Sequence, residues 1–283
     1  MNSLDREVIT WFLENKRDLP WRKSDAWGVM VSEFMLQQTP VSRVLPKWNE
    51  WMSRWPSPAA LSAATPSEVI TAWGRLGYPR RALRLYQCAK IIVEDFGGDV
   101  PRTEAELLSL PGIGEYTAAA IVAFAFEGRS LVLDINIRRV LSRIIDGVEF
   151  PPPAPTKSEK ASRESLIPAE DAHIWAAATM ELGALICTSK SPKCEICPVK
   201  GRCNWRALDY PNSEVLRKSQ RWHGTDRQCR GTIVQALRES NSLTESELKR
   251  LWHDDSQVEK ALQTLQGDGL IAEINSLTYA LPH

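Results

Sequence analysis

The chain has 283 residues, of which 43% are hydrophobic and 25% are charged, as is typical of a soluble globular protein. No run of about 18 uncharged apolar residues occurs, so a membrane span is excluded and no membrane partner is expected. The formal net charge of +0 argues against a strongly basic nucleic-acid-binding protein, although residues 1–223 hold 29 basic against 26 acidic residues. The N-terminal residues include acids and no long apolar run, which predicts a cytoplasmic protein without a secretory signal.

Helical periodicity dominates the chain up to residue 269, and strand signals are nearly absent there, which predicts an all-α fold. Three tryptophans at helical spacing in residues 47–55 predict an aromatic core face on a helix that ends before Pro56. Residues 150–165 are rich in proline and polar residues, so we expect a surface connection there. Further helices are predicted in residues 61–78 (with a break), 81–98, 103–110, 115–128, 133–145 and 171–187.

A polar stretch near residues 215–225 indicates a boundary, beyond which a small C-terminal module begins. Three helices followed by a short hairpin around Asn275 and Ser276 are the outline of a winged-helix module at residues 224–283. Such modules often bind DNA, but this one has 6 basic against 9 acidic residues. A packing or partner-docking role is therefore at least as well supported. The three helices are predicted in residues 226–240, 244–254 and 256–269.

Four of the six cysteines fall within 17 residues and form a dense potential ligand set. In a cytosolic chain such clustering indicates metal binding rather than disulfides. Zinc sites made of four cysteines usually use two separated Cys-x2-Cys pairs, whereas this loop has one. Four thiolates on one continuous loop favour a [4Fe–4S] cluster, with zinc as the alternative. The four ligands would be Cys187, Cys194, Cys197 and Cys203, whereas Cys88 and Cys229 are expected to be structural thiols.

A glycine-rich turn, Leu110-Pro111-Gly112-Ile113-Gly114, lies between two predicted helices. Its glycines permit a tight turn and a close approach of the backbone to a ligand. The exposed N–H groups at the start of the following helix would form an anion site suited to a DNA phosphate. Taken alone, this pattern is weak, since many helical hairpins contain glycine.

Two carboxylates are candidates for catalysis, and each has a structural alternative. Asp134 precedes a predicted helix and would serve as its N-cap, but it could also stabilise positive charge on a sugar. Glu33 lies in a helical, mostly apolar run, where burial would raise its pKa and make it a proton donor. The alternative for Glu33 is an ordinary surface position.

Several motifs in the same order resemble the helix-hairpin-helix DNA glycosylase superfamily, and most closely its adenine DNA glycosylases of the MutY type. The resemblance implies two helical halves with DNA bound by both, one holding the cluster (residues 1–25 and 135–215) and one of six helices with the hairpin (residues 26–134). It rests on LPWR at 19–22, SEFMLQQT at 32–39, GRLGY at 74–78, LPGIGEYTA at 110–118, LDINIRRV at 133–140, MELGALIC at 180–187 and the cysteine loop.

The resemblance implies hydrolysis of the N-glycosidic bond of adenine paired with 8-oxoguanine or guanine, with the target base flipped out of the stack. Glu33 matches the acid that protonates adenine at N7, and Asp134 matches the carboxylate that stabilises the sugar cation. Asn136 would hold the sugar and Asp134, and Tyr116 would line the catalytic pocket. Two carboxylates with pKa values pushed apart are the general pattern for such pairs.

The resemblance also assigns residues that bind the DNA and the base. Trp21 and Arg22 would line the adenine pocket, and Gln38 and Tyr78 would wedge into the duplex beside 8-oxoguanine. The phosphate site would be formed by Gly112, Ile113 and Gly114. The implied partner is double-stranded DNA containing a mispaired adenine, bound by a monomer associated with the nucleoid.

Tyr116 separates this chain from the endonuclease III branch, which carries a lysine at the matching position as a Schiff-base nucleophile. A tyrosine cannot form that imine, so the resemblance implies a monofunctional glycosylase. Three alternatives remain: a thymine or uracil mismatch glycosylase, an endonuclease III-like enzyme of the same fold, and a non-enzymatic cluster-bearing DNA-binding protein. The C-terminal residues depart from the family, whose C-terminal domain resembles a Nudix fold.

Overall fold

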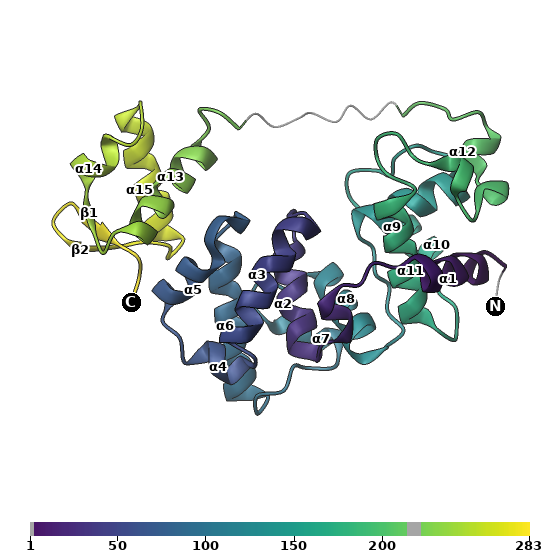
Figure 1. The fold of residues 1–283 in the computed structure, drawn as a ribbon, viewed down its shortest axis with the longest axis horizontal. Helices are drawn as coiled ribbons and strands as arrows, with labels where there is room; N and C mark the ends of the chain where they lie inside the picture. The colour runs from purple at the N-terminus through teal and green to yellow at the C-terminus, as the bar shows by residue number, and fades with distance from the viewer. Residues whose placement is uncertain (1–2, 214–221) are drawn as a thin grey trace. The chain divides into compact units, whose positions relative to one another are not determined.

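The computed structural model describes residues 3–213 and 222–283, and helices dominate it as predicted (Figure 1). Contacts along the chain divide it into two units. The first unit comprises Met1–Val29, Arg102–Leu108 and Ile113–Lys218, and the second comprises Met30–Pro101, Ser109–Gly112 and Ser219–His283. Among the described residues, no helix combines the length and the apolar character that a membrane crossing requires.

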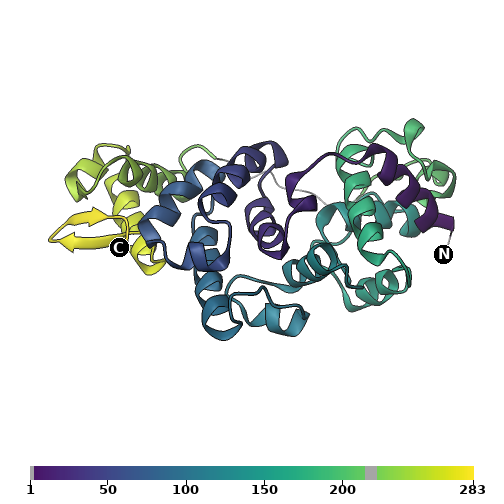
Figure 2. The same ribbon diagram turned by 60° about the horizontal axis from the view of Figure 1, so that its bottom comes forward.

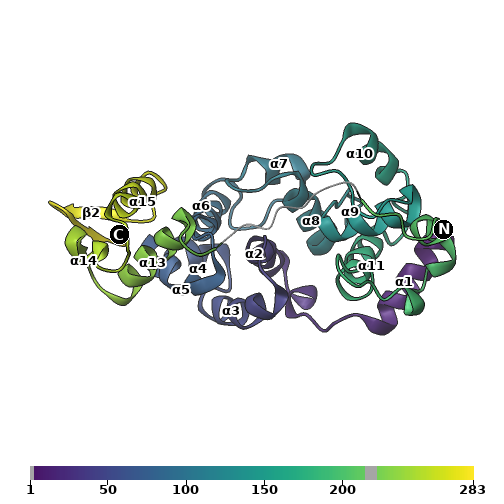
Figure 3. The same ribbon diagram turned by 90° about the horizontal axis from the view of Figure 1, so that it is seen from above.

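The first unit is built around α11 (Ala172–Leu185), an almost wholly apolar helix that packs against α1, α8 and α9. Figure 3 shows α1 alongside α11. Gly183 permits this packing, because a Cβ there would lie 2.7 Å from Asn136 Cβ on α9. The other helices of the unit are α1 (Ser3–Asn15), α7 (Glu104–Ser109), α8 (Glu115–Phe126), α9 (Ile135–Leu141), α10 (Lys157–Glu164) and α12 (Asn204–Ala207). Its short helical turns are η1 (Pro20–Lys23), the π-helix η3 (Ser142–Asp146), η4 (Cys194–Ile196) and η5 (Lys200–Arg202).

The second unit contains the predicted tryptophan face. Trp48, Trp51 and Trp55 are all buried, and the Trp51 ring packs edge-to-face on the rings of Trp55 and Trp73 at 4.6 and 5.5 Å. The expectation of an aromatic core there is confirmed. The break predicted in residues 61–78 is also present, because Thr65 forms a capping box with Glu68 at the start of α5. The helices are α2 (Ala26–Leu36), α3 (Val41–Arg54), α4 (Pro58–Ser62), α5 (Pro66–Trp73), η2 (Gly74–Leu76) and α6 (Arg80–Asp95).

The C-terminal module (residues 222–283) has the predicted three helices and a hairpin, shown by the yellow strands in Figure 2. Its elements are α13 (Asp226–Glu239), β1 (Leu243–Thr244), α14 (Glu245–Lys249), α15 (Asp255–Gly267), β2 (Ala272–Asn275) and β3 (Thr278–Ala280). The three strands form an antiparallel sheet in the order β1-β3-β2, with Leu243 opposite Tyr279 and Ala272 opposite Ala280. The predicted boundary near residues 215–225 falls mostly on residues 214–221, which lie outside the described residues.

One sequence expectation differs from the structure, and the predicted domain limits remain untested. Residues 150–165 are not only a connection, because Thr156 caps α10 there and Arg138 pairs with Glu159 on that helix at 2.7 Å. The contact-based division also places α8 in the first unit, whereas the predicted boundary assigned residues 26–134 to one half. Alanines of α8 pack in the same core as α9 and α11, which explains its grouping. The predicted domain limits stay a prediction.

Candidate active site and cluster loop

Asp134 is fixed at the start of α9 by hydrogen bonds to both of its oxygens. The backbone N–H of Ile137 donates to Oδ1 at 2.6 Å, and Asn136 Nδ2 donates to Oδ2 at 2.7 Å. The N-cap expected from the sequence is therefore present, and the amide of Asn136 holds the second oxygen. Burial raises the pKa of Asp134, while these hydrogen bonds act to lower it. The structure thus brings together two of the residues assigned to the sugar.

Arg139 connects this carboxylate to the cysteine loop. Its Nη2 donates to Asn136 Oδ1 at 2.9 Å and to the backbone oxygen of Gly183 at 2.7 Å. Its Nε donates to the backbone oxygen of Cys187 at 2.8 Å. Arg139 is 4% exposed, and this burial strengthens its hydrogen bonds relative to bonds at the surface. A single side chain therefore orients Asn136 and anchors the first residue of the cysteine loop.

The glycine-rich turn leads directly into α8. Gly112 has a φ of +84°, and a Cβ there would lie 2.6 Å from Arg84 Cδ, so both conformation and space require glycine. Ile113 is buried, and Gly114 forms the exposed N-cap of α8. Tyr116, in the first turn of α8, is half-buried against the core of the first unit. The turn therefore has the exposed helix start that phosphate binding needs.

Glu33 lies near the middle of α2 and is 5% exposed. The alternative of a solvent-exposed surface glutamate is wrong, because the neighbouring Met30, Phe34 and Met35 are fully buried around it. Burying a carboxyl group in such a helix costs free energy unless the group is hydrogen-bonded. The structure assigns Glu33 to the second unit and Asp134 to the first.

Trp21 and Arg22 lie in η1 of the first unit. Trp21 is buried, and Arg22 pairs with Glu181 of α11 at 3.0 Å. Arg17 pairs with the same carboxylate at 2.6 Å. Glu181 is 1% exposed, and although burial acts to raise its pKa, the hydrogen bonds from both arginines hold that pKa at about 2. Glu181 thus fixes the segment that carries both predicted adenine-pocket residues.

Gln38 and Tyr78 occupy the tips of two loops of the second unit, and both are exposed. Each has a positive φ, 55° for Gln38 and 48° for Tyr78, a backbone conformation that residues other than glycine rarely adopt. The buried guanidinium of Arg81 holds both loops. Nη1 donates to the carbonyl oxygens of Phe34, Met35 and Gln37, and Nη2 donates to those of Leu76 and Gly77 and to Thr39 Oγ1.

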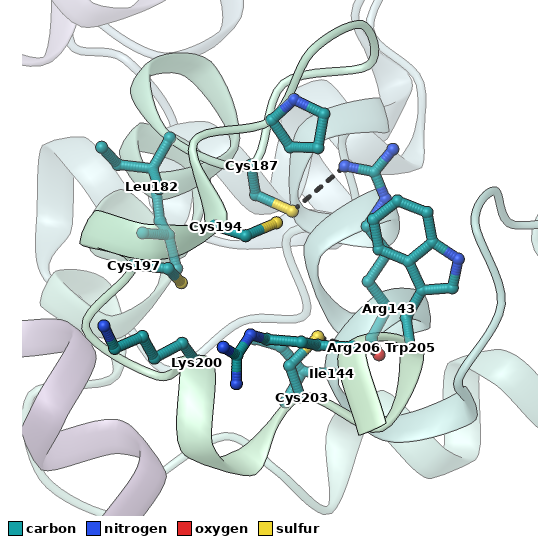
Figure 4. A pocket seen from close by; sticks show the side chains of 12 residues that line it. Arg143, Ile144, Leu182, Cys187, Cys194, Cys197, Lys200, Cys203, Trp205 and Arg206 are labelled. Atoms are coloured by element: carbon teal, nitrogen blue, oxygen red, sulfur yellow. Dashed lines mark hydrogen bonds between the residues drawn. The ribbon is translucent and has the colours of Figure 1, made fainter. Parts of the chain in front are cut away.

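The four clustered cysteines border one pocket, with their sulfur atoms facing a shared space (Figure 4). No three His, Cys, Asp or Glu side chains of the described residues surround a point that a single ion could fill. Four thiolates that border one pocket suit a polynuclear cluster, in which each iron takes one cysteine. Arg143 Nη1 donates to Cys187 Sγ at 3.4 Å. Arg143 Nη2 and Arg206 Nε are buried at this pocket without hydrogen-bond partners in the described structure, which suits a negatively charged occupant.

Comparison with known families agrees with this geometry. Residues 31–180 match the HhH-GPD superfamily of base excision DNA repair proteins, and residues 187–203 match the iron–sulfur binding domain of endonuclease III. The adenine DNA glycosylase of Mycolicibacterium smegmatis is 46% identical over 97% of this chain and 94% of its own length. The chain belongs to the adenine DNA glycosylase family. It is a base excision repair DNA glycosylase that binds DNA and carries a [4Fe–4S] cluster, and the matched iron–sulfur domain spans the four clustered cysteines at residues 187–203.

Other relatives show how much of this chain is shared with known proteins. The adenine DNA glycosylase of Mycobacterium tuberculosis (strain H37Rv) is 41% identical over 98% of this chain and 93% of its own length. The human one is 39% identical over 70% of this chain and 38% of its own length. A thermostable thymine-DNA glycosylase matches 73% of this chain and 96% of its own with a TM-score of 0.67 and 25% identity. A non-covalent endonuclease III–DNA complex, 20% identical over 73% of this chain and 96% of its own, shows the same fold with a TM-score of 0.63.

Sequence reasoning missed three buried charged residues that organise the site: Arg81, Arg139 and Glu181. Arg139 and Glu181 lie in segments that already resembled the family, and Glu181 is the one Asp, Glu, Lys or Arg in the mostly apolar residues 172–187. That contrast was the available signal, because a charged side chain on a buried helix face must be paired or hydrogen-bonded.

Proposed function

We propose that this chain hydrolyses the N-glycosidic bond of adenine mispaired with 8-oxoguanine or guanine in double-stranded DNA, and that it acts as a monomer. The observation that carries the proposal is the Asp134 carboxylate, held by the Ile137 N–H and the Asn136 amide directly downstream of the hairpin and α8. The full-length similarity to proteins named adenine DNA glycosylase supports adenine as the base.

We assign the acid and the charge stabiliser to two different carboxyl groups acting on one flipped nucleotide. Glu33, which is buried, would act as the acid and donate a proton to N7 of adenine, which makes the base a good leaving group. As the bond to the sugar breaks, the carboxyl group of Asp134 would stabilise the positive charge on the sugar. A water molecule then adds to the sugar and gives up a proton, which the deprotonated Glu33 would accept. Asn136 would hold Asp134 in the orientation that this step needs.

Tyr116 supports a monofunctional reaction. A phenol cannot form the imine through which a lysine nucleophile would lead to strand cleavage. The expected product is therefore an abasic site in an intact strand. The iron–sulfur cluster would cross-link the four thiolates and keep the loop ordered. We propose that the reaction takes place in the cytoplasm at the nucleoid.

The test is a panel of duplexes containing A:8-oxoG, A:G, T:G and U:G, incubated with the purified protein and then treated with alkali. Alkali-dependent nicking of the adenine strand is expected, with no nick before alkali. Nicking only at T:G or U:G would establish the thymine or uracil alternative. The similarity to the thymine-DNA glycosylase is the reason to include these duplexes. Nicking without alkali would indicate an endonuclease III-like reaction, and DNA binding without base removal from any duplex would indicate a non-enzymatic protein.

A further inference from the structure

Within the second unit, the C-terminal module contacts α5 and α6 through residues other than Arg227 and Trp222. Ile70 of α5 lies in the same buried core as the helices of the module. Arg238 Nε donates to the backbone oxygen of Ile70 at 3.1 Å. Asp268 pairs with Arg80 of α6 at 3.1 Å and with Arg230 of α13 at 2.5 Å. The module is therefore held in place by an apolar core, a backbone contact and an ion-pair cluster.

This docking brings Arg227 of the module to Tyr78, at the tip of the loop before α6. Arg227 Nη1 donates to the Tyr78 hydroxyl at 2.8 Å, and its guanidinium lies 5.8 Å from that ring centroid. On another side the guanidinium lies 4.9 Å from the ring centroid of Trp222. Tyr78 and Trp222 remain 43% and 46% exposed, so this contact adds little buried area to the docking. Two aromatic rings instead restrict the rotamers of an arginine at the surface.

The surroundings of Tyr78 are basic even though the module is net acidic. Arg43 and Arg75 are both exposed, and the Arg43 side chain donates to the Arg75 carbonyl oxygen. Two carboxylates of the adjoining elements are already paired, Asp226 with Lys260 and Asp268 with Arg80 and Arg230. Exposed arginines interspersed with aromatic rings are the surface chemistry that nucleic acids favour.

We propose that Tyr78, Arg227 and Trp222 form one duplex-binding surface, so that the C-terminal module is a working part of DNA binding. We call these three residues the arginine–aromatic surface. Arg227 contacts a backbone phosphate, and the two rings keep its side chain in place and add apolar contact to the sugars. The net charge of the module concealed this surface, because the adjacent carboxylate of Asp226 is paired with Lys260. The inference rests on DNA binding, and it does not require that adenine be the excised base.

The test measures equilibrium binding of the full-length protein to a fully paired duplex over a series of salt concentrations. Arg227→Ala is expected to weaken binding about tenfold and to reduce the slope of log Kd against log salt by about 1, as expected for one lost phosphate contact. Arg227→Lys should retain the slope, and Trp222→Ala should weaken binding by a smaller factor. Arg250→Ala removes an equally exposed arginine from the same module and should change neither quantity.

Two results would overturn the proposal. One is an Arg227→Ala protein that is folded and docked but has the affinity and salt slope of Arg250→Ala. The other is an equal loss of affinity in Arg227→Ala and Arg227→Lys with the slope unchanged, which would show a docking role alone. Because the duplex contains no mispair, failure to release adenine in a separate assay would refute the proposed function and leave this surface standing.

Discussion

Replacing Arg139 with glutamine should uncouple the sugar-stabilising carboxylate from the cluster loop. The guanidinium makes three hydrogen bonds, to Asn136 and to the carbonyl oxygens of Gly183 and Cys187. Each hydrogen bond from a charged donor contributes about 1.5 kcal/mol or more, and the acceptors would be left buried. The unfolding free energy should therefore fall by about 3 to 5 kcal/mol, a large part of the stability of a typical domain.

The activity should fall as well, for a separate reason. Without Arg139, the amide of Asn136 loses the donor that orients it, and Asn136 in turn positions Asp134. A displacement of about 1 Å at the reacting atoms costs on the order of 100-fold in rate. The rate constant of adenine release in single turnover should therefore drop by about 10- to 100-fold, with KM little changed. The visible absorption of the cluster per chain should also decrease, because the Cys187 carbonyl is no longer held.

Arg138→Gln is the matched control. Arg138 is adjacent and equally buried, but it pairs with Glu159 rather than with Asn136. In denaturant titrations, Arg138→Gln should lower the free energy of unfolding by a similar amount. Its kcat and its cluster content should stay close to those of the parent protein. Equal kcat and equal cluster absorption for the folded Arg138 and Arg139 variants would refute the coupling.

Further outcomes follow from the geometry. Glu33→Gln should abolish adenine release while leaving the Kd for duplex DNA within about twofold, and retained single-turnover release would contradict its role as the acid. Glu181→Gln should remove about 3 kcal/mol of stability at neutral pH, because the pKa of Glu181 falls from 4.5 to about 2 on folding. That contribution is present above pH 4.5 and is lost as the pH falls towards 2, so the variant should show a flatter acid dependence in chemical unfolding. Gly112→Ala should lose about 1 to 2 kcal/mol from its positive φ and displace Arg84, weakening DNA binding, and an unchanged Kd would argue against the hairpin as a phosphate site. Cys197→Ser should lose visible absorption and iron, and a colourless, zinc-loaded parent protein would contradict the cluster itself.

Local sequence patterns were sufficient for the helices, the hairpin turn and the cysteine loop. Each of these is determined by residues close in sequence: the capping of α9 by Asp134, the positive φ of Gly112, and the cysteine spacing in one continuous loop. The three helices and the hairpin of the C-terminal module were likewise readable from periodicity. Such features depend on backbone geometry within a few residues, which composition and spacing express directly.

Features that depend on distant partners were not readable. The contact of Arg139 with Cys187 spans 48 residues, and that of Arg22 with Glu181 spans 159. The contact of Arg227 with Tyr78 spans 149 residues, and the acidic composition of the module argued against any such role. A single sequence shows that a charge is present in an apolar helix, but it does not show which partner compensates that charge.

Arg81 has a consequence for engineering mispair preference. One guanidinium donates hydrogen bonds to carbonyl oxygens within residues 34–37 and to those of residues 76 and 77. The loop tips that carry Gln38 and Tyr78 are therefore held in place by the same side chain. Inserting or deleting a residue in either loop would withdraw acceptors from a buried cation and disturb the other loop at the same time. Exchange of these loops between enzymes should therefore transfer both segments together with the arginine that joins them.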